Sequence, residues 1–220
     1  LKKLGANIKI KNGYILAKAK NGLRGAKIKF PSISVGATEN AIIAASYAEG
    51  VSYISNCATE PEIQDLINFL KKMNVNINWV GKRKIKIEGT KKLKSANYKI
   101  MFDRIETGTF IIAGALIGTN IVISGIETKV LKKELQVLKK MGVKLEIKSK
   151  EIKILKSRKI KPISITTAPY PGFPTDLQAQ IMVLMTKANG TSTIKENIFE
   201  NRFMHVPELI RMGAKINILD

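Results

Sequence analysis

Alternating apolar and polar residues mark short β-strands along the chain. The segments IKIKNG and KRKIKIEG repeat this alternation, which is typical of a strand with one face in the core and one in water. Two hairpins are predicted, one pairing residues 8–10 with 14–17 across Asn12-Gly13, the other pairing residues 77–80 with 85–88. Asn-Gly favours a tight primed turn, so the first pairing is the better specified.

A repeat with a period of about 70 residues connects these strands to helices. Four related segments recur along the chain: LKKLGANIKI, FLKKMNVNINWV, VLKKMGVKLEI and LIRMGAKINI. Each reads as the end of a helix, a residue that tolerates a left-handed backbone, and an alternating strand. The residues at the turn are spaced by 69, 68 and 71 positions; they are Gly5, Asn74, Gly142 and Gly213.

Strongly apolar helices form a second series with the same period. They are predicted to close at Gly50, Gly118 and Gly190, which are 68 and 72 residues apart, and each runs into a β-rich segment. Residues 110–117 are apolar on nearly every side of the helix, and such a helix is buried inside a protein rather than laid on its surface. The pattern therefore predicts the α/β class, with helices in the middle of a domain and sheets outside.

Three equivalent helix starts are the candidate places for chemistry. They cover residues 34–38, 103–108 and 173–176. The N-terminus of a helix presents free backbone N–H groups and the positive end of the helix dipole, which together favour phosphate or carboxylate. The polar side chains at these starts are equally suited to plain helix capping, so both interpretations stay open on the residues alone.

The third start follows a stiff segment, because residues 168–180 (APYPGFPTDLQAQ) carry three prolines and a glycine within six positions. Thr175 and Asp176 stand where an N-cap is expected, just ahead of the apolar run 181–185. One interpretation makes Asp176 a cap. The other makes it a reactive carboxylate at the mouth of a buried helix.

A second polar cluster lies at residues 200–208, ENRFMHVPE. Arg202 can clamp a carboxylate or phosphate with its planar guanidinium group. His205 is either a general base or a structural histidine at a helix start. Cys57 is either a nucleophile activated by a helix dipole or a buried bystander. With one histidine and one cysteine, the sequence excludes a multi-histidine or multi-thiolate metal site.

Composition describes a globular chain of 220 residues, of which 45% are hydrophobic, enough for one large or two small cores. No run approaches the roughly 18 apolar residues of a membrane span. The first ten residues lack the pattern of a signal peptide. The single cysteine cannot form an internal disulfide, which fits a reducing compartment. We therefore expect a cytoplasmic protein with no membrane partner.

The net charge of +21 raises the alternative of nucleic-acid binding. Only six of the 38 basic residues are arginines, however, and the lysines alternate along predicted strands, where they face solvent. We interpret the charge as a lysine-rich surface whose field favours anionic small substrates. A basic nucleic-acid-binding protein remains an alternative.

Five separated strings, in this order, resemble the UDP-N-acetylglucosamine 1-carboxyvinyltransferases of the enolpyruvyl transferase family. They are SVGATENAI, EPEIQDLINFLKKM, DRIETGTF, APYPGFPTDLQAQ and ENRFMHVPELIRMGA. The resemblance extends over essentially the whole chain. A sister enzyme, 5-enolpyruvylshikimate-3-phosphate synthase, shares the fold without this combination of strings and is the alternative within the family.

The resemblance implies two pseudo-threefold domains, each an inside-out α/β barrel with central helices and outer sheets, in agreement with the repeat. Residues 1–101 would be the later part of one domain and residues 102–220 the earlier part of the second. The implied reaction transfers the enolpyruvyl group of phosphoenolpyruvate to the 3′-hydroxyl of UDP-N-acetylglucosamine, the first committed step of peptidoglycan precursor synthesis. It involves no cofactor and no nucleic acid, and a monomer is favoured.

The resemblance also assigns a substrate-binding group in the first half of the chain. Ser34, Val35 and Gly36 match the loop that holds the uridine diphosphate part of the nucleotide sugar. Ser32 stands where many relatives have a lysine facing the phosphates, so one electrostatic contact is expected to be missing here.

A second group carries over in the other half of the chain. Asp176 matches the aspartate that contacts the sugar hydroxyl and is implicated as the base that takes its proton, and Ile198 matches a position that touches the nucleotide sugar. Arg202 matches an arginine that engages phosphoenolpyruvate. Cys57 does not match the catalytic loop cysteine of the family. That cysteine and other family residues match no position here, so the chain by itself is expected to be inactive.

Overall fold

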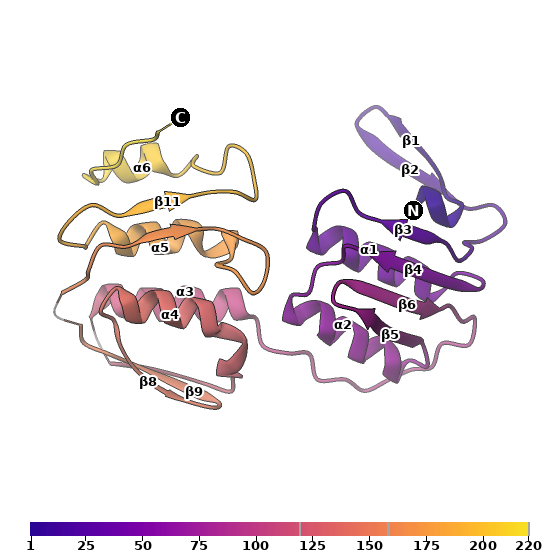
Figure 1. Cartoon of the computed structure of the whole chain (residues 1–220), viewed down its shortest axis with the longest axis horizontal. Coiled ribbons are helices and arrows are strands. Elements are labelled where there is room, and N and C mark those ends of the chain that lie inside the picture. The colour runs from indigo at the N-terminus through magenta and orange to yellow at the C-terminus, as the bar shows by residue number, and fades with distance from the viewer. Residues whose placement is uncertain (119, 158, 220) are drawn as a thin grey trace. The chain divides into compact units, whose positions relative to one another are not determined.

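The structure, a computed structural model, describes residues 1–118, 120–157 and 159–219. The chain forms two compact units, unit 1 (Leu1–Met101) and unit 2 (Phe102–Asp220). In each unit helices pack against one face of a twisted sheet, and a hydrophobic core fills the space between the two layers (Figure 1).

Unit 1 packs two helices, α1 (Val35–Ser46) and α2 (Pro61–Lys72), on a four-stranded sheet. The strand order is β3-β4-β6-β5, with β3 parallel to β4 and the other pairs antiparallel. Ile54, Ile85 and Ile87 are fully buried, and the residues between them along the strands are not, so the predicted alternation is confirmed. The strands are β3 (Lys27–Lys29), β4 (Val51–Ser55), β5 (Asn76–Gly81) and β6 (Lys84–Glu88).

Both hairpins predicted from the sequence are present. After the short helix η1 (Lys2–Leu4), β1 (Asn7–Lys11) pairs antiparallel with β2 (Tyr14–Lys18). Asn12 and Gly13 connect the two strands with φ of 52° and 78°, the left-handed backbone of a primed turn. β5 and β6 form the second antiparallel hairpin.

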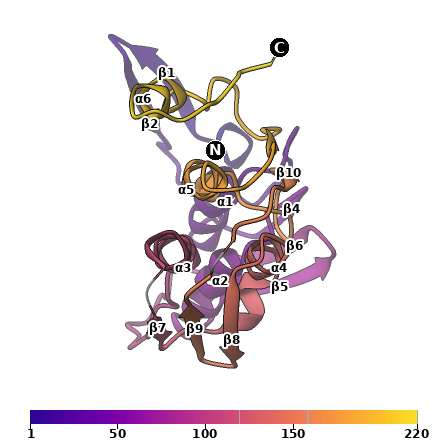
Figure 2. The ribbon, with the colours of Figure 1, turned by 90° about the vertical axis from the view of Figure 1, so that its left-hand side faces the viewer.

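Unit 2 repeats this arrangement and adds part of a further copy. Helices α3 (Arg104–Ile117) and α4 (Lys132–Lys140) pack on the antiparallel sheet β7-β9-β8, and α5 (Gln178–Met185) lies beside α3. Figure 2 views α3 and α5 nearly end-on, so the axes of these two helices are nearly parallel. The other elements are β7 (Ile121–Ser124), η2 (Thr128–Leu131), β8 (Lys144–Lys148), β9 (Glu151–Leu155), β10 (Ser164–Thr166), η3 (Thr175–Leu177), β11 (Thr193–Lys195) and α6 (Val206–Arg211).

The residues at the four repeat turns adopt the left-handed backbone that the period predicts. Their φ angles are 95° at Gly5, 75° at Asn74, 83° at Gly142 and 95° at Gly213. Strands follow the first three turns, but residues 214–219 after the fourth are irregular. No described strand pairs with them, and a strand needs a partner for its backbone hydrogen bonds.

The apolar helices differ from the prediction in two respects. Only α3 ends directly at its glycine, with Gly118 as a left-handed C-cap, whereas α1 and α5 end several residues before Gly50 and Gly190. The helices are also not buried on every side within their units. Ile43 of α1 is 55% exposed and Phe110 of α3 is 58% exposed. Within its own unit, each helix is covered only on the faces that pack against the hydrophobic core.

Helix α3 approaches η3 closely at Gly108. A Cβ atom there would lie 2.4 Å from Cδ1 of Leu177, whose side chain is fully buried. We expect Gly108→Ala to lower the free energy of unfolding by about 1–3 kcal/mol, because extra volume forces a packed core to shift. Thermal unfolding measures this, with Gly36→Ala as the control, since a Cβ at Gly36 meets no atom within 4 Å. An unchanged midpoint for Gly108→Ala would contradict the expectation.

Candidate functional site

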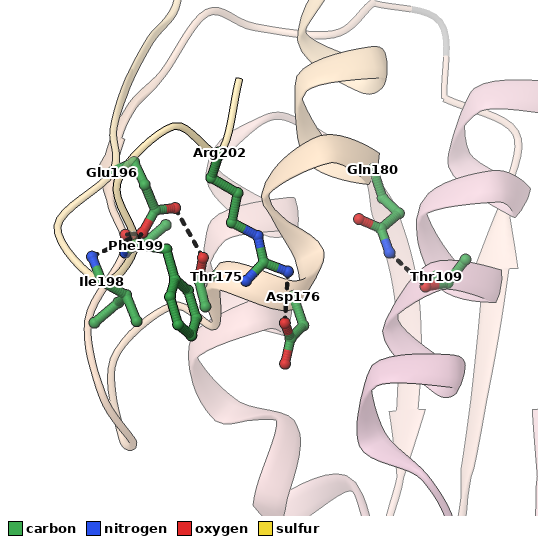
Figure 3. A network of polar contacts seen from close by, with 9 residues as sticks. Thr109, Thr175, Asp176, Gln180, Glu196, Ile198, Phe199 and Arg202 are labelled. Carbon is green, nitrogen blue, oxygen red and sulfur yellow. Dashed lines mark hydrogen bonds and ion pairs between the residues drawn. The ribbon is translucent and has the colours of Figure 1, made fainter. Parts of the chain in front are cut away.

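A carboxylate and a guanidinium group meet at the start of α5. Asp176 lies in η3, and Arg202 lies in the segment between β11 and α6. Arg202 Nη2 donates a hydrogen bond to Asp176 Oδ1 at 2.7 Å (Figure 3). Their side chains are 35% and 56% exposed, respectively, so solvent reaches both. An exposed ion pair contributes at most about 1 kcal/mol, so either group can exchange its partner for a ligand at little cost.

Asp176 does not cap α5, so this part of the sequence interpretation is wrong. Pro174 occupies the N-cap position of η3 and Leu177 that of α5, and neither helix has a side-chain cap bond. The carboxylate of Asp176 binds Arg202 instead. The guanidinium is a charged donor, which makes a stronger hydrogen bond to a carboxylate than a neutral backbone N–H group does.

The other two helix starts are capped as expected. Ala37 N donates to Ser34 Oγ at 3.3 Å at the start of α1. At the start of α3, Ile105 N donates to Asp103 Oδ1 at 2.7 Å, and the next backbone N–H group donates to the same oxygen at 3.1 Å. The three starts are therefore equivalent in the repeat but differ in what their polar side chains bind.

The segment that carries Arg202 also carries Ile198 and Phe199. The ring centroid of Phe199 lies 5.1 Å from Arg202 Cζ, a cation–π contact that helps to hold the guanidinium group in place. Ile198 is half-buried in the same segment. The structure thus brings three of the predicted site residues, Asp176, Ile198 and Arg202, into one region of unit 2 (Figure 3).

Sequence reasoning missed Glu196, which accepts four hydrogen bonds in this region. Its donors include the hydroxyl of Thr175, the residue before Asp176. A single acidic residue after the run STIK has no periodic pattern around it, and its partners are distant in the sequence. No local signal therefore distinguishes it from an ordinary solvated glutamate.

Cys57 is the buried bystander of its two interpretations, and His205 lies half-buried at the N-cap position of α6. Burial, with a smaller contribution from the charge of Arg202, lowers the pKa of His205, which keeps the imidazole neutral at pH 7. Its Nε2 is buried without a hydrogen-bond partner among the described residues. Burial raises the pKa of the Cys57 thiol to about 11, and its Sγ donates to Ile54 O at 3.4 Å. A thiol with that pKa is not a nucleophile at neutral pH.

The remaining predicted site residues lie in unit 1, at the loop before α1 and in its first turn. They are Ser32, Ser34, Val35 and Gly36. Thr38, which is fully buried, fixes this helix start: its hydroxyl donates to Ser34 O at 2.7 Å and accepts from Ala58 N at 3.0 Å. The first N–H groups of a helix have no partner within the helix, so this turn can bind an anion. The predicted site residues therefore form two groups, one in each unit.

Metal-binding clusters and membrane-spanning helices were both sought in the part of the chain that the structure describes. No group of three or more His, Cys, Asp or Glu side chains there could hold a metal ion. None of the helices over residues 1–118, 120–157 and 159–219 is long and apolar enough to cross a membrane.

Two surface hollows of unit 2 are lined by residues other than the candidate side chains. One, of about 700 Å³, lies between α4 and the turn of the β8–β9 hairpin. The other, of about 900 Å³, lies between α5, β11 and α6. Neither is lined by Asp176, Ile198 or Arg202, although Phe203, which directly follows Arg202, lines the second.

Comparison with known sequences gives a consistent picture. The family described as EPSP synthase (3-phosphoshikimate 1-carboxyvinyltransferase) matches residues 1–220. The UDP-N-acetylglucosamine 1-carboxyvinyltransferase of Pelagibacter ubique is 59% identical over 218 residues, which are 99% of this chain and 52% of the relative. The protein of the same name from Beijerinckia indica is 48% identical over 219 residues, 99% of this chain and 51% of the relative. The chain spans about half the length of the curated relatives it matches.

Solved structures confirm the predicted fold. The enolpyruvyl transferase NikO from Streptomyces tendae superposes with a TM-score of 0.90 at 24% identity, covering 100% of this chain and 55% of that one. An EPSP synthase from Acinetobacter baumannii gives a TM-score of 0.65 at 18% identity, covering 96% of this chain and 51% of that one. The inside-out α/β architecture and the resemblance that the sequence indicated are both confirmed.

Proposed function

The chain belongs to the EPSP synthase (3-phosphoshikimate 1-carboxyvinyltransferase) family, and on this premise we propose that it is part of a transferase acting on UDP-N-acetylglucosamine. The enzyme would transfer the enolpyruvyl group of phosphoenolpyruvate to the 3′-hydroxyl of that sugar. The acceptor is supported by 59% identity, over 99% of the chain, to a protein named for it. The chemistry is supported by one observation in unit 2, the exposed Asp176–Arg202 pair.

In the proposed reaction Asp176 acts as the general base. Its carboxylate takes the proton of the sugar hydroxyl while the hydroxyl oxygen attacks C2 of phosphoenolpyruvate, and C3 takes up a proton. Loss of a proton from C3 and of phosphate from C2 then restores the double bond. A base within hydrogen-bond reach of the hydroxyl helps because the proton leaves as the new C–O bond forms.

Arg202 has the complementary role of holding the anionic substrate. A guanidinium group has five N–H donors, and the bond to Asp176 uses one of them. The remaining donors can bind the carboxylate or phosphate of phosphoenolpyruvate while Asp176 stays close. Positive charge fixed at this point stabilises the negative charge that develops during addition.

The group in unit 1 would bind the nucleotide part of the acceptor. Ser34, Val35 and Gly36 at the N-terminus of α1 suit the diphosphate, with Ser32 in the loop before them. In unit 2, Ile198 would contact the nucleotide sugar. Proton transfer and charge stabilisation by side chains suffice for addition and elimination, so the proposal includes no cofactor.

The proposal also states which part of the whole protein this chain forms and where in the cell the protein acts. Unit 1 would be the later part of one transferase domain and unit 2 the earlier part of the next. The protein would act in the cytoplasm, as a monomer, on a precursor of peptidoglycan.

The test uses the complete protein that carries this chain. With phosphoenolpyruvate, we expect phosphate release with UDP-N-acetylglucosamine to be at least about 10²-fold faster than with shikimate 3-phosphate, because an acceptor site rejects ligands that leave its polar groups unpaired. A coupled phosphate assay measures both rates. The reverse preference would assign the protein to the other acceptor, and no release with either one would refute the proposal.

A further inference from the structure

The carboxylate of Glu196 connects the segment that carries Asp176 to the segment that carries Arg202. Its Oε2 accepts a hydrogen bond from Thr175 Oγ1 at 2.8 Å, and Thr175 directly precedes Asp176. Its Oε1 accepts hydrogen bonds from two successive backbone N–H groups, at 2.8 and 3.2 Å, in the segment that leads to Arg202. One side chain therefore bonds both to the turn that contains Asp176 and to the segment that leads to Arg202 (Figure 3).

A further contact anchors Glu196 to the parallel strand pair β10–β11, a two-stranded sheet of its own in unit 2. Thr167, which is fully buried, donates its hydroxyl proton to Glu196 Oε1 at 2.8 Å and accepts from Asn197 N at 3.0 Å. The backbone N–H of Thr167 donates to Lys195 O at 2.9 Å. Thr167 follows β10 and Lys195 ends β11, so the parallel strand pair fixes the carboxylate.

Glu196 is charged at neutral pH. Burial alone would raise its pKa, but the hydrogen bonds from two backbone N–H groups and two hydroxyls outweigh burial and hold the pKa below its usual range. Within the described ranges its carboxylate forms no ion pair, so these four donors balance its charge. Removing the carboxylate would leave all four groups to find other partners at once.

We propose that Glu196 is a positioning residue for the carboxyvinyl transfer. It holds the turn of Asp176 against the segment of Arg202, so that base and cation keep a constant separation when substrates bind. This inference rests on the proposed function. The direct bond between Asp176 and Arg202 is exposed and therefore weak, and Arg202 must turn its donors towards the substrate, so a second, internal connection is needed.

Three variants of the complete protein separate the contacts of Glu196. Glu196→Ala removes all four hydrogen bonds. Thr175→Val removes only the connection to the turn of Asp176. Glu196→Gln keeps an oxygen acceptor for the backbone N–H groups and an amide that can donate to the hydroxyl of Thr175. The steady-state kcat and KM of each variant are compared with those of the wild type.

We expect kcat to fall about 10²-fold in Glu196→Ala and about 10-fold in Thr175→Val, because misplacing a reacting group by an ångström costs rates of this order. Glu196→Gln should restore kcat to within about 5-fold of the wild type, since it keeps the connections. In Thr175→Val the KM for phosphoenolpyruvate should change less than about 2-fold, because the segment of Arg202 keeps its own bonds to Glu196.

Thr109→Val is the matched control. It removes another threonine hydroxyl of unit 2, which accepts from Gln180 Nε2 at 3.1 Å between α3 and α5, without touching Glu196 (Figure 3). Its kcat should stay within about 2-fold of the wild type. Thermal midpoints are recorded for all variants. A merely structural role of Glu196 would lower the midpoint of Thr175→Val and leave the kcat of the folded protein unchanged.

Each possible result either supports or overturns the positioning role of Glu196. Wild-type kcat in Glu196→Ala, or equal losses in Thr175→Val and Thr109→Val, would overturn it. If the wild-type protein releases no phosphate with either acceptor, the proposed function fails, and amide hydrogen exchange then tests Glu196 separately. Glu196→Ala should speed exchange at the amides of Ile198 and Phe199, and unchanged exchange would overturn the positioning role.

Discussion

Asp176→Asn in the complete protein is expected to lower kcat by about 10²–10⁴-fold, the contribution of a general base, while the Kd for UDP-N-acetylglucosamine changes less than about 3-fold. Asparagine has nearly the shape of aspartate and keeps an oxygen that can accept the bond from Arg202 Nη2. It cannot take the proton of the sugar hydroxyl. Phosphate release measures turnover, and titration calorimetry measures binding.

The control for Asp176→Asn is the same substitution at the equivalent helix start. Asp103 caps α3 through the backbone N–H groups of Ile105 and Glu106, and asparagine caps a helix about as well as aspartate. Asp103→Asn should therefore leave both kcat and Kd close to those of the wild type. Parallel losses of binding and turnover in Asp176→Asn would show that this carboxylate has a mainly structural role.

Arg104→Leu is expected to lower the free energy of unfolding by about 3–5 kcal/mol, because it removes one member of a buried ion pair. Arg104 Nη1 lies 3.2 Å from Glu134 Oε1, and the two side chains are only 7% and 4% exposed. The guanidinium group also lies 5.8 Å from the ring centroid of Tyr170, in the proline-rich segment that leads to Asp176. The substitution should therefore also loosen that segment. Denaturation with urea measures the change.

Two further variants test this explanation of Arg104. The double variant Arg104→Leu, Glu134→Leu removes both charges and should recover much of the lost stability, since a buried pair can often be replaced by apolar residues. Arg211→Leu breaks an exposed pair with Glu208, whose side chains are 77% and 65% exposed, and should have little effect. Equal effects of Arg104→Leu and Arg211→Leu would rule out the buried charge as the cause.

The repeat was predictable from the sequence because its evidence is local. A left-handed backbone is tolerated by glycine and asparagine and by few other residues, so Asn74 and Gly142 could be recognised as turns, and their positive φ angles confirm this. The hairpin at Asn12-Gly13 follows from the same preference. The strand expected after Gly213 does not form, because pairing depends on a neighbour that no local pattern specifies.

The candidate site was less predictable because its contacts join distant parts of the chain. Local sequence gives Asp176 a capping position, but Arg202, 26 residues further on, competes for its carboxylate and binds it. Glu196 contacts Thr167, which lies 29 residues earlier, and nothing in the residues around either one indicates the bond. The resemblance to a known family assigned separate roles to Asp176 and Arg202, but it gave no role to Glu196.

The four turn residues show that copies of a repeat can have the same backbone conformation but different tolerance for a side chain at the turn. Gly213 would accept a side chain as far as space is concerned, since a Cβ there meets no atom within 4 Å. At Gly142 a Cβ would lie 3.2 Å from the carbonyl oxygen of Lys159. An idealised protein built by averaging the copies could therefore use glycine at every turn, whereas asparagine transferred from position 74 to position 142 would require Lys159 to move by a few tenths of an ångström, a demand that the shared backbone does not reveal.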